Sequence, residues 1–402
     1  MVSLKQFLAG LAFVPVVLSH PPPDQHSKIA PKVIIISMFG PEGEAWWGIP
    51  EFDVLAHNIT VPGLSPLYPH VHCTADKVIC QLITGESEIN AAVTITSLAF
   101  SELFDLRSTY FFVAGIAGVN PMHATTGSAT FARYAIQVAL QYEIDAREMP
   151  HNFTTGYVPQ GSLAPGQYPQ SIYGTEVFEL NNELRTRAVG FAKNAQLADS
   201  AAAQTYRANY LQNSTHGIYQ MGGSPPSVVE CDVATSDVYY SGDLLSQAFD
   251  NTTTLLTNGT GQYCTTAQED NATLEALLRA AVHDRVDFSR IVVMRTASDF
   301  DRPYPGEDAA YHLLYADQAG FEISIENIYR AGIHVVQGIV GEWKETFSHG
   351  VKPNNYIGDI LGTLSGGNPN FGPGRILALE ESGALLTKRS RSVLSKRWSN
   401  RL

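Results

Sequence analysis

Short runs of apolar residues recur along the chain, and their lengths fit β-strands that are buried inside a protein. Apolar runs of roughly four to eight residues, bounded by polar or glycine-containing turns, are typical of strands that are covered on both faces. The clearest run is VIIIS at 33–37, where every residue but the last is aliphatic. The segments expected to form strands are 33–37, 76–84, 109–115, 130–140, 236–243 and 290–296.

Helical periodicity appears between these runs. Apolar residues recur every three or four positions over 90–104, 182–196 and 272–284, which predicts helices in these segments. Strands that alternate with helices indicate an α/β fold. We therefore expect a three-layer sandwich in which a central mixed β-sheet is flanked by helices. In open α/β sheets, ligands bind in the crevice at the carboxyl ends of the strands.

No internal repeat and no low-complexity linker divides the chain into two halves, so we expect one domain over residues 31–387. A loop rich in Pro, Gly, Tyr and Thr occupies residues 145–175. A loop of this length in a compact domain is usually either functional or disordered. Its aromatic residues favour an ordered lid over a pocket, with a disordered loop as the alternative.

The two ends of the sequence differ from the domain between them. Residues 1–19 combine a lysine with an apolar run from Phe7 to Leu18, which is typical of a secretory signal peptide and too short for a membrane span. The uncharged segment 108–132 is also not expected to span a membrane, because its second half is polar. Residues 388–402 hold six of the 26 basic residues and predict a solvated tail, whose dibasic pairs are candidate processing sites.

Sequons and cysteines agree with export to an oxidising compartment. Asparagines in the N-x-S/T pattern stand at Asn58, Asn152, Asn213, Asn251, Asn258 and Asn271. Pairing Cys73 with Cys80 and Cys231 with Cys264 keeps both disulfide loops short, although four cysteines permit three connectivities. We expect the protein to be secreted or held at the cell surface or cell wall.

Charge and motifs exclude several classes of protein. The net charge of −13 argues against nucleic acids and anionic membranes as partners. No C-x-x-C pair is present, and the HVH triplet at 70–72 alternates like a strand with no nearby third ligand, so we expect no metal site. The sequence also lacks G-x-S-x-G, P-loop, G-x-G-x-x-G and H-E-x-x-H motifs, and we expect no cofactor.

Charged and polar residues gather instead where the predicted strands end. In a doubly wound sheet these ends meet in one crevice, which makes the residues candidates for a ligand site. The candidates are Glu42 and Glu44 after 33–37, GESEIN at 85–90 after 76–84, Glu269 and Asp270 before 272–284, and Arg295, Ser298 and Asp299 after 290–296.

Each candidate also has a purely structural explanation. Asp299 alone would serve as a helix cap, and Asp301 with Arg302 would form a surface ion pair. Glu269 and Asp270 would complement the dipole of the helix that follows them. Their occurrence together, in one order along the chain, favours a functional site.

The order of these pieces resembles the nucleoside phosphorylase and nucleosidase superfamily. DKVICQLITGESEINAAVTITSLAF at 76–100 has that superfamily's strand, glycine-containing turn and Asn-Ala-Ala helix, and SDVYYSGD, TAQEDNA and VMRTASD follow in its order. More narrowly, FGPEGEAWW, CDVATSDVYYSGDLLSQAF and MRTASDFDRP resemble the fungal purine nucleoside permease family. The resemblance covers about residues 31–380 and implies a nucleoside phosphorylase-like fold that binds purine nucleosides.

The resemblance also implies roles for individual residues. Asp299 matches the acid that protonates purine N7, with Ser298 beside it at the base. Glu269 matches the carboxylate that binds the ribose hydroxyls, and Glu42 matches the glutamate that positions water in hydrolytic members. Asp299 donates a proton only if burial raises its pKa. The remaining substrate contacts expected are Gln268, Gly115 and Arg295.

The reaction implied is cleavage of the N-glycosidic bond of purine nucleosides, which passes through an oxocarbenium-like sugar. Hydrolysis is favoured because Glu42 would repel phosphate. The alternatives are phosphorolysis, with phosphate as co-substrate, and a non-catalytic surface protein that binds nucleosides for uptake. Two departures stand out: Gln268 replaces the methionine of nucleosidases, and the sequon at Asn271 lies inside the motif, where we expect no glycan. The preferred purine and the oligomeric state, a homo-oligomer included, stay open.

Overall fold

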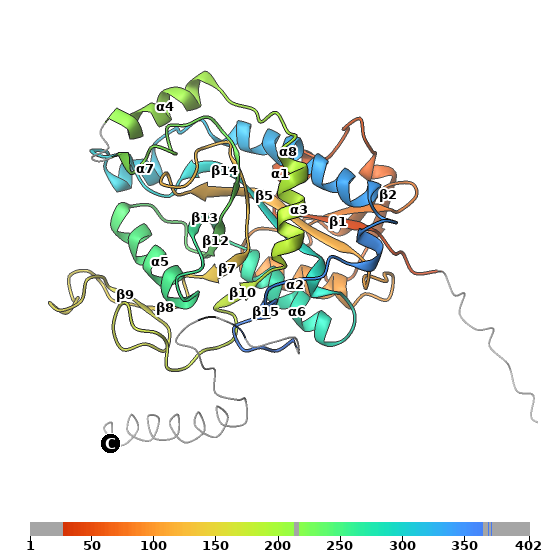
Figure 1. The fold of residues 1–402 in the computed structure, drawn as a ribbon, viewed down its shortest axis with the longest axis horizontal. Helices are drawn as coiled ribbons and strands as arrows, with labels where there is room; N and C mark the ends of the chain where they lie inside the picture. Colours follow the sequence, from red (N-terminus) through yellow and green to blue (C-terminus); the bar gives the residue numbers. More distant parts are fainter. Residues whose placement is uncertain (1–26, 213–216, 365–368, 370, 372–402) are drawn as a thin grey trace, which may run out of the picture.

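The computed structural model describes residues 27–212, 217–364, 369 and 371 (Figure 1). A mixed sheet of 13 strands crosses the middle of the molecule, with helices on both of its faces. The expected three-layer α/β architecture is therefore confirmed. The predicted signal peptide at 1–19 and the basic tail at 388–402 lie outside the described residues.

The central sheet follows the order β15-β10-β7-β12-β13-β5-β1-β4-β3-β2, while β14 pairs with β5 and β6, and β11 pairs with β6. A separate hairpin joins β8 (Gln141–Glu143) to β9 (Tyr157–Pro159). The strands of the central sheet are β1 (Val33–Ser37), β2 (His57–Thr60), β3 (His70–Cys73), β4 (Ile79–Ile83), β5 (Tyr110–Val119), β6 (Ala129–Phe131), β7 (Tyr134–Gln137), β10 (Val177–Glu179), β11 (Val228–Glu230), β12 (Asp232–Thr235), β13 (Tyr263–Ala267), β14 (Ile291–Phe300) and β15 (Gly358–Asp359).

Two pairs of helices cover opposite faces of the sheet. The alternation of β1 shows why: Ile34 and Ile36 lie in the core beneath α2 and α6, while Val33 and Ile35 lie in the core beneath α3 and α8. No helix within 27–212 or 217–364 has the length and apolar character needed to cross a membrane. The helices are α1 (Gly40–Glu44), α2 (Ser87–Ala99), α3 (Asn182–Ala192), α4 (Ala201–Gln212), α5 (Asp243–Leu256), α6 (Asp270–Val282), α7 (Ala309–Leu314) and α8 (Phe321–Gly341), with 3₁₀ turns at Val54–Ala56, Phe288–Arg290 and Phe347–His349.

Most of the predicted elements are present, with shifted ends. The helices expected at 90–104, 182–196 and 272–284 are α2, α3 and α6. The strand expected at 130–140 is divided into β6 and β7, because β6 pairs with β11 and β14 whereas β7 pairs with β10 and β12. Strand β13 and the long helix α8 were not predicted.

The strand predicted at 236–243 is wrong. Strand β12 already ends at Thr235, and the apolar side chains that suggested a buried strand are 58% exposed at Val238 and 63% exposed at Tyr239. Gly242 adopts φ +135° as the N-cap of α5, a conformation that favours glycine. Residues 236–242 therefore form a loop, and this loop borders the candidate site.

Both disulfides follow the short-range pairing. Cys73–Cys80 joins β3 to β4, and Cys231–Cys264 joins the residue before β12 to β13. Of the three connectivities that the sequence permits, the structure has the one with the two local loops.

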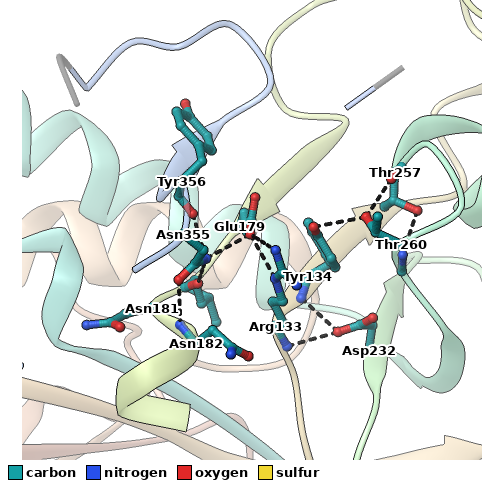
Figure 2. Close-up of polar contacts among 12 residues, drawn as sticks. Arg133, Tyr134, Glu179, Asn181, Asn182, Asp232, Thr257, Thr260, Asn355 and Tyr356 are labelled. Carbon is teal, nitrogen blue, oxygen red and sulfur yellow. Dashed lines mark hydrogen bonds and ion pairs between the residues drawn. The ribbon is translucent and has the colours of Figure 1, made fainter. Parts of the chain in front are cut away.

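A buried polar network fixes the edge of the sheet that lies away from β1 (Figure 2). Arg133 donates to the Glu179 carboxylate at 2.8 Å from Nε, and Asn355 donates to the same carboxylate oxygen at 2.7 Å. The Asp232 carboxylate accepts from the backbone amides of Arg133 and Tyr134, both at 2.9 Å. These bonds tie β7, β10 and β12 to the segment that leads into β15.

Candidate active site

A pocket opens beside the carboxyl-terminal part of β5, between α1, the loop after β12, and β13 and β14. Six of the seven residues predicted for the site line it, namely Glu42, Gln268, Glu269, Arg295, Ser298 and Asp299. The seventh, Gly115, lies directly behind Glu42. The remaining lining residues are Met38, Phe39, Glu86, Ile116, Ala117, Gly118, Ser236, Val238, Tyr239, Tyr240, Thr266, Ala267 and Asp301.

Strand β14 carries three of these residues in a way that differs from the prediction. The strand does not end at Thr296 but continues to Phe300, so that Arg295, Ser298 and Asp299 lie within it. A bulge between Ala297 and Asp299 shifts its register against β5. Bulges re-aim side chains at functional sites, and here the bulge lies where Ser298 and Asp299 line the pocket.

Arg295 forms the buried centre of the site. Its side chain donates to Asp270 Oδ1 at 2.6 Å and Oδ2 at 3.3 Å, to Glu269 Oε2 at 3.2 Å, and to the Ile116 carbonyl at 3.1 Å. Arg295 is 2% exposed and Asp270 is fully buried. The two neighbouring carboxylates raise the pKa of the guanidinium, which outweighs the effect of its burial. Asp270 was a candidate in the sequence without an assigned role, and its role here is to hold Arg295.

Glu42 enters the pocket from α1. Its Oε2 accepts from the Met38 amide at 2.6 Å, and its Oε1 accepts from the Ile116 amide at 2.7 Å. Burial raises the pKa of Glu42 to about 8, with a further rise from Glu269 and an opposing effect of Arg295. Glu44, the alternative two residues away, is exposed to solvent. The structure therefore selects Glu42 of the two.

Gly115 makes room for this carboxylate. A Cβ atom at Gly115 would lie 2.5 Å from Glu42 Oε1 and 2.8 Å from Glu42 Cδ, and it would overlap Met38. Such separations are shorter than van der Waals contact, so a larger residue would displace Glu42. Gly115 is in the middle of β5 and not in a turn, and its contribution to the site is this free space.

Glu269 stands at the N-cap of α6, two residues after the end of β13. Its Oε1 accepts from the Ser87 amide at the start of α2, at 2.9 Å, and its Oε2 accepts from Arg295. Burial raises the pKa of Glu269, while Arg295 opposes that rise. Its neighbour Gln268 donates from Nε2 to the Asp237 carbonyl at 3.1 Å and so fixes the loop after β12 beside the pocket.

Asp299 faces the pocket from the bulge of β14. Tyr239 donates to its Oδ2 at 2.9 Å, and the Ser298 hydroxyl lies 2.5 Å from its Oδ1. Burial raises the pKa of Asp299, although both hydrogen bonds favour the charged form. Tyr239 was not predicted as a site residue, because the sequence placed it in a strand.

The hydroxyl of Ser298 lies between two acceptors. A serine hydroxyl has one hydrogen, and the Ala117 carbonyl at 3.1 Å and Asp299 Oδ1 at 2.5 Å both lie within reach of it. When the hydroxyl donates to Asp299, the bond favours the charged carboxylate and opposes the rise in pKa that burial causes.

Other predictions near the site turn out differently. Asp301 and Arg302 form an ion pair at 2.8 Å, but both are buried, at 2% and 3% exposure, so the expectation of a surface pair is wrong. No residue of 145–175 lines the pocket, so this loop is not its lid; Tyr168 and Ile172 pack instead on the core around α5. Asn271 is buried and donates to the Thr175 carbonyl at 2.7 Å. Among the described residues, no group of three or more His, Cys, Asp or Glu is placed to hold a metal ion.

The fold and pocket define an α/β protein with a carboxylate-rich ligand site on a mixed sheet, and comparison with known proteins gives its family. A family model described as purine nucleoside permease (NUP) matches residues 30–352. A purine nucleoside permease of Candida albicans is 45% identical over 348 residues, which cover 85% of this chain and 83% of that protein. A probable purine nucleoside permease of Schizosaccharomyces pombe is 40% identical over 327 residues, which cover 79% of this chain and 92% of that protein. The chain belongs to the purine nucleoside permease family.

Solved structures show weaker likeness. A 5′-methylthioadenosine/S-adenosylhomocysteine nucleosidase from Helicobacter pylori is 13% identical with a TM-score of 0.47, covering 78% of this chain and all of that one. The futalosine hydrolase of the same bacterium is 13% identical with a TM-score of 0.45, covering 78% of this chain and 98% of that one.

Proposed function

We propose that the protein is a purine nucleoside N-ribohydrolase, which binds a purine nucleoside in this pocket and cleaves its N-glycosidic bond with water. The observation that carries the proposal is that Asp299, Glu269 and Glu42 face one pocket from three different elements. The three groups needed are an acid for the departing base, an anion for the sugar hydroxyls and a base for the attacking water.

Asp299 acts as the acid in this proposal. Burial raises the pKa of Asp299 and so favours its protonated form, and proton transfer to purine N7 makes the base a better leaving group. When the proton has left, Tyr239 and Ser298 are placed to stabilise the carboxylate. The same two hydrogen bonds hold the carboxyl group in place before transfer.

Glu269 and Glu42 act on the sugar side. The carboxylate of Glu269 accepts hydrogen bonds from the ribose hydroxyls, and Arg295 supports its ionised form. Each oxygen of Glu42 accepts one backbone N–H, which leaves a lone pair on each for a water molecule. Ionised Glu42 takes a proton from that water as it attacks the anomeric carbon.

The charge of the pocket favours water over phosphate as the nucleophile. Arg295 is the only arginine or lysine among the described residues that line the pocket, and four hydrogen bonds commit its guanidinium to Asp270, Glu269 and Ile116. A phosphate bound near Glu42 would meet carboxylates without a free cation to neutralise it. Phosphorolysis is thus the less favoured reaction.

We place this activity outside the cell. The proposal rests on the signal sequence predicted at 1–19, on the two disulfides, and on sequons at exposed positions such as Asn58 and Asn152. A second candidate function is nucleoside binding for uptake without cleavage, and the permease names of the relatives favour it.

The test is release of free purine from adenosine, guanosine and inosine by purified protein, with and without phosphate. Hydrolysis predicts ribose and free base in the absence of phosphate, and Asp299→Asn lowers the rate by about 10²–10⁴-fold while nucleoside binding persists. Release that requires phosphate would identify a phosphorylase. Saturable binding with no release would leave the binding protein as the function.

A further inference from the structure

A second chamber continues the pocket beyond Asp299. The two cavities share Phe39, Tyr239, Ser298 and Asp299, among other residues, and therefore adjoin each other. The second one extends along α7 and the turn that follows it to the start of α8. Neither Glu42 nor Glu269 lines it. The chamber thus adjoins the acid end of the site and not the sugar end.

The walls of this chamber offer apolar surface. Phe321, at the start of α8, is 43% exposed and lies against Phe39, with ring centroids 6.4 Å apart. Leu313 is 36% exposed, and Ala316 is a small residue that also lines the chamber. An apolar ligand group that covers these side chains removes apolar surface from water, which makes the free energy of binding more favourable.

Three polar side chains of the chamber, Ser241, His312 and Gln318, are bonded to one another. His312 Nδ1 lies 2.6 Å from Ser241 Oγ, and its Nε2 lies 3.0 Å from Gln318 Nε2. Burial lowers the pKa of His312 to about 4, so the ring is neutral, accepts from Gln318 and donates to Ser241. Gln318 Oε1 in turn accepts from the Phe300 amide at 2.7 Å. An apolar group that enters the chamber therefore does not strip these polar side chains of their partners.

The position of the chamber indicates which part of a ligand reaches it. In a purine, N7 and the exocyclic group at C6 lie on the same edge of the ring system. If Asp299 contacts N7, as the proposed function requires, the group at C6 points past Asp299. From this geometry we propose that the second chamber is a subsite for an apolar substituent on the exocyclic N6 of a purine nucleoside. This inference rests on the proposed function and adds N6-substituted adenosines to its substrates.

The experiment compares N6-benzyladenosine with adenosine as substrates of the full-length protein. We expect wild-type protein to cleave N6-benzyladenosine with a kcat/KM at least about equal to that for adenosine, because the benzyl group is buried in the chamber. Ala316→Phe fills the chamber and lowers the ratio of the two kcat/KM values by about tenfold or more. Leu314→Phe, two residues away at the end of α7 and outside the chamber, leaves the ratio unchanged. Phe321→Ala is a second test if Ala316→Phe does not fold, and it also lowers the ratio.

The outcomes separate this inference from the proposed function. Cleavage of adenosine without cleavage or binding of N6-benzyladenosine overturns the subsite and leaves the hydrolase intact. An equal fall of the ratio in Leu314→Phe overturns the subsite as well. If neither nucleoside is cleaved, the hydrolase proposal fails, and the subsite is then tested by measuring the binding of both nucleosides by calorimetry. Binding of N6-benzyladenosine that is tighter than that of adenosine, and that Ala316→Phe weakens, supports the subsite. Any other binding result overturns it.

Discussion

Three buried carboxylates share one guanidinium at the centre of the pocket. Asp270 and Glu269 form ion pairs with Arg295, and the positive charge of Arg295 also lowers the pKa of Glu42. Burial disfavours the charged form of a carboxyl group, and the single positive charge of Arg295 offsets this effect only in part. The pKa of Glu42 is therefore raised to about 8.

This protonation predicts how activity depends on pH. Glu42 accepts a proton from water only when it is ionised, so kcat/KM rises as pH increases toward about 8. Glu42→Gln lowers kcat/KM by about 10²–10⁴-fold and removes this rise from the residual activity. The matched control is Glu44→Gln, since Glu44 is exposed two residues away. A pH–rate profile of Glu42→Gln that keeps the same rise would show that another group is the base.

Tyr239 gives a prediction for the opposite limb of the profile. Its hydroxyl stabilises ionised Asp299, so Tyr239→Phe raises the pKa of Asp299 further and keeps the acid protonated to higher pH. The loss of kcat/KM that accompanies ionisation of Asp299 therefore moves to higher pH in Tyr239→Phe. Tyr311→Phe, an exposed tyrosine outside the pocket, serves as control. A limb that stays in place or moves to lower pH contradicts the assignment of Asp299 as the acid.

At the scale of elements, β5 leaves room for the Glu42 carboxylate because Gly115 has no side chain. Gly115→Ala places a methyl group against Glu42 and Met38, inside a strand that both neighbours hold in place. We expect a loss of about 1–3 kcal/mol in the free energy of unfolding, together with a large loss of kcat. Gly190→Ala, where an added Cβ meets nothing on the exposed face of α3, is the control and gains about 0.4–1 kcal/mol. Urea unfolding measures both variants, and equal stabilities would contradict the packing argument.

The sequence predicts well those elements whose apolar residues are buried in the core. VIIIS at 33–37 and the helix that became α6 are examples, because every apolar residue of β1 and most of those in α6 lie in the core. The strand at 236–243 failed because Val238 and Tyr239 border a pocket and are exposed. An apolar residue at a ligand site and one in a core look alike in a sequence.

The candidate site could be predicted in its residues but not in its geometry. Motif order brought Glu42, Glu269 and Asp299 together, and the structure places all three around one pocket. The pairing of Arg295 with Asp270 depends on how β14 folds back against the start of α6, 25 residues earlier in the chain. The bulge at Ser298 depends on pairing between β14 and β5. Neither feature has a local signal in the sequence.

At the scale of the whole molecule, burial decides which sequons are compatible with the fold. Asn271 is 1% exposed, and its amide nitrogen, the atom to which a glycan attaches, donates to the Thr175 carbonyl. A glycan there would break this bond and displace the segment before β10 from α6. Asn58, Asn152, Asn251 and Asn258 are all exposed.

If the protein is exported, as we propose, we expect it to carry glycans at some of these exposed asparagines and none at Asn271. Glycopeptide mapping of protein secreted from a eukaryotic host measures occupancy at each sequon. Asn271→Gln provides a separate check: it leaves the glycan mass unchanged, whereas Asn58→Gln lowers it if that site is occupied. A glycan at Asn271 in folded protein would contradict the placement of α6, and with it the position of Glu269 at the N-cap of that helix. Glycopeptide mapping therefore tests both the export of the protein and the placement of α6 beside its site.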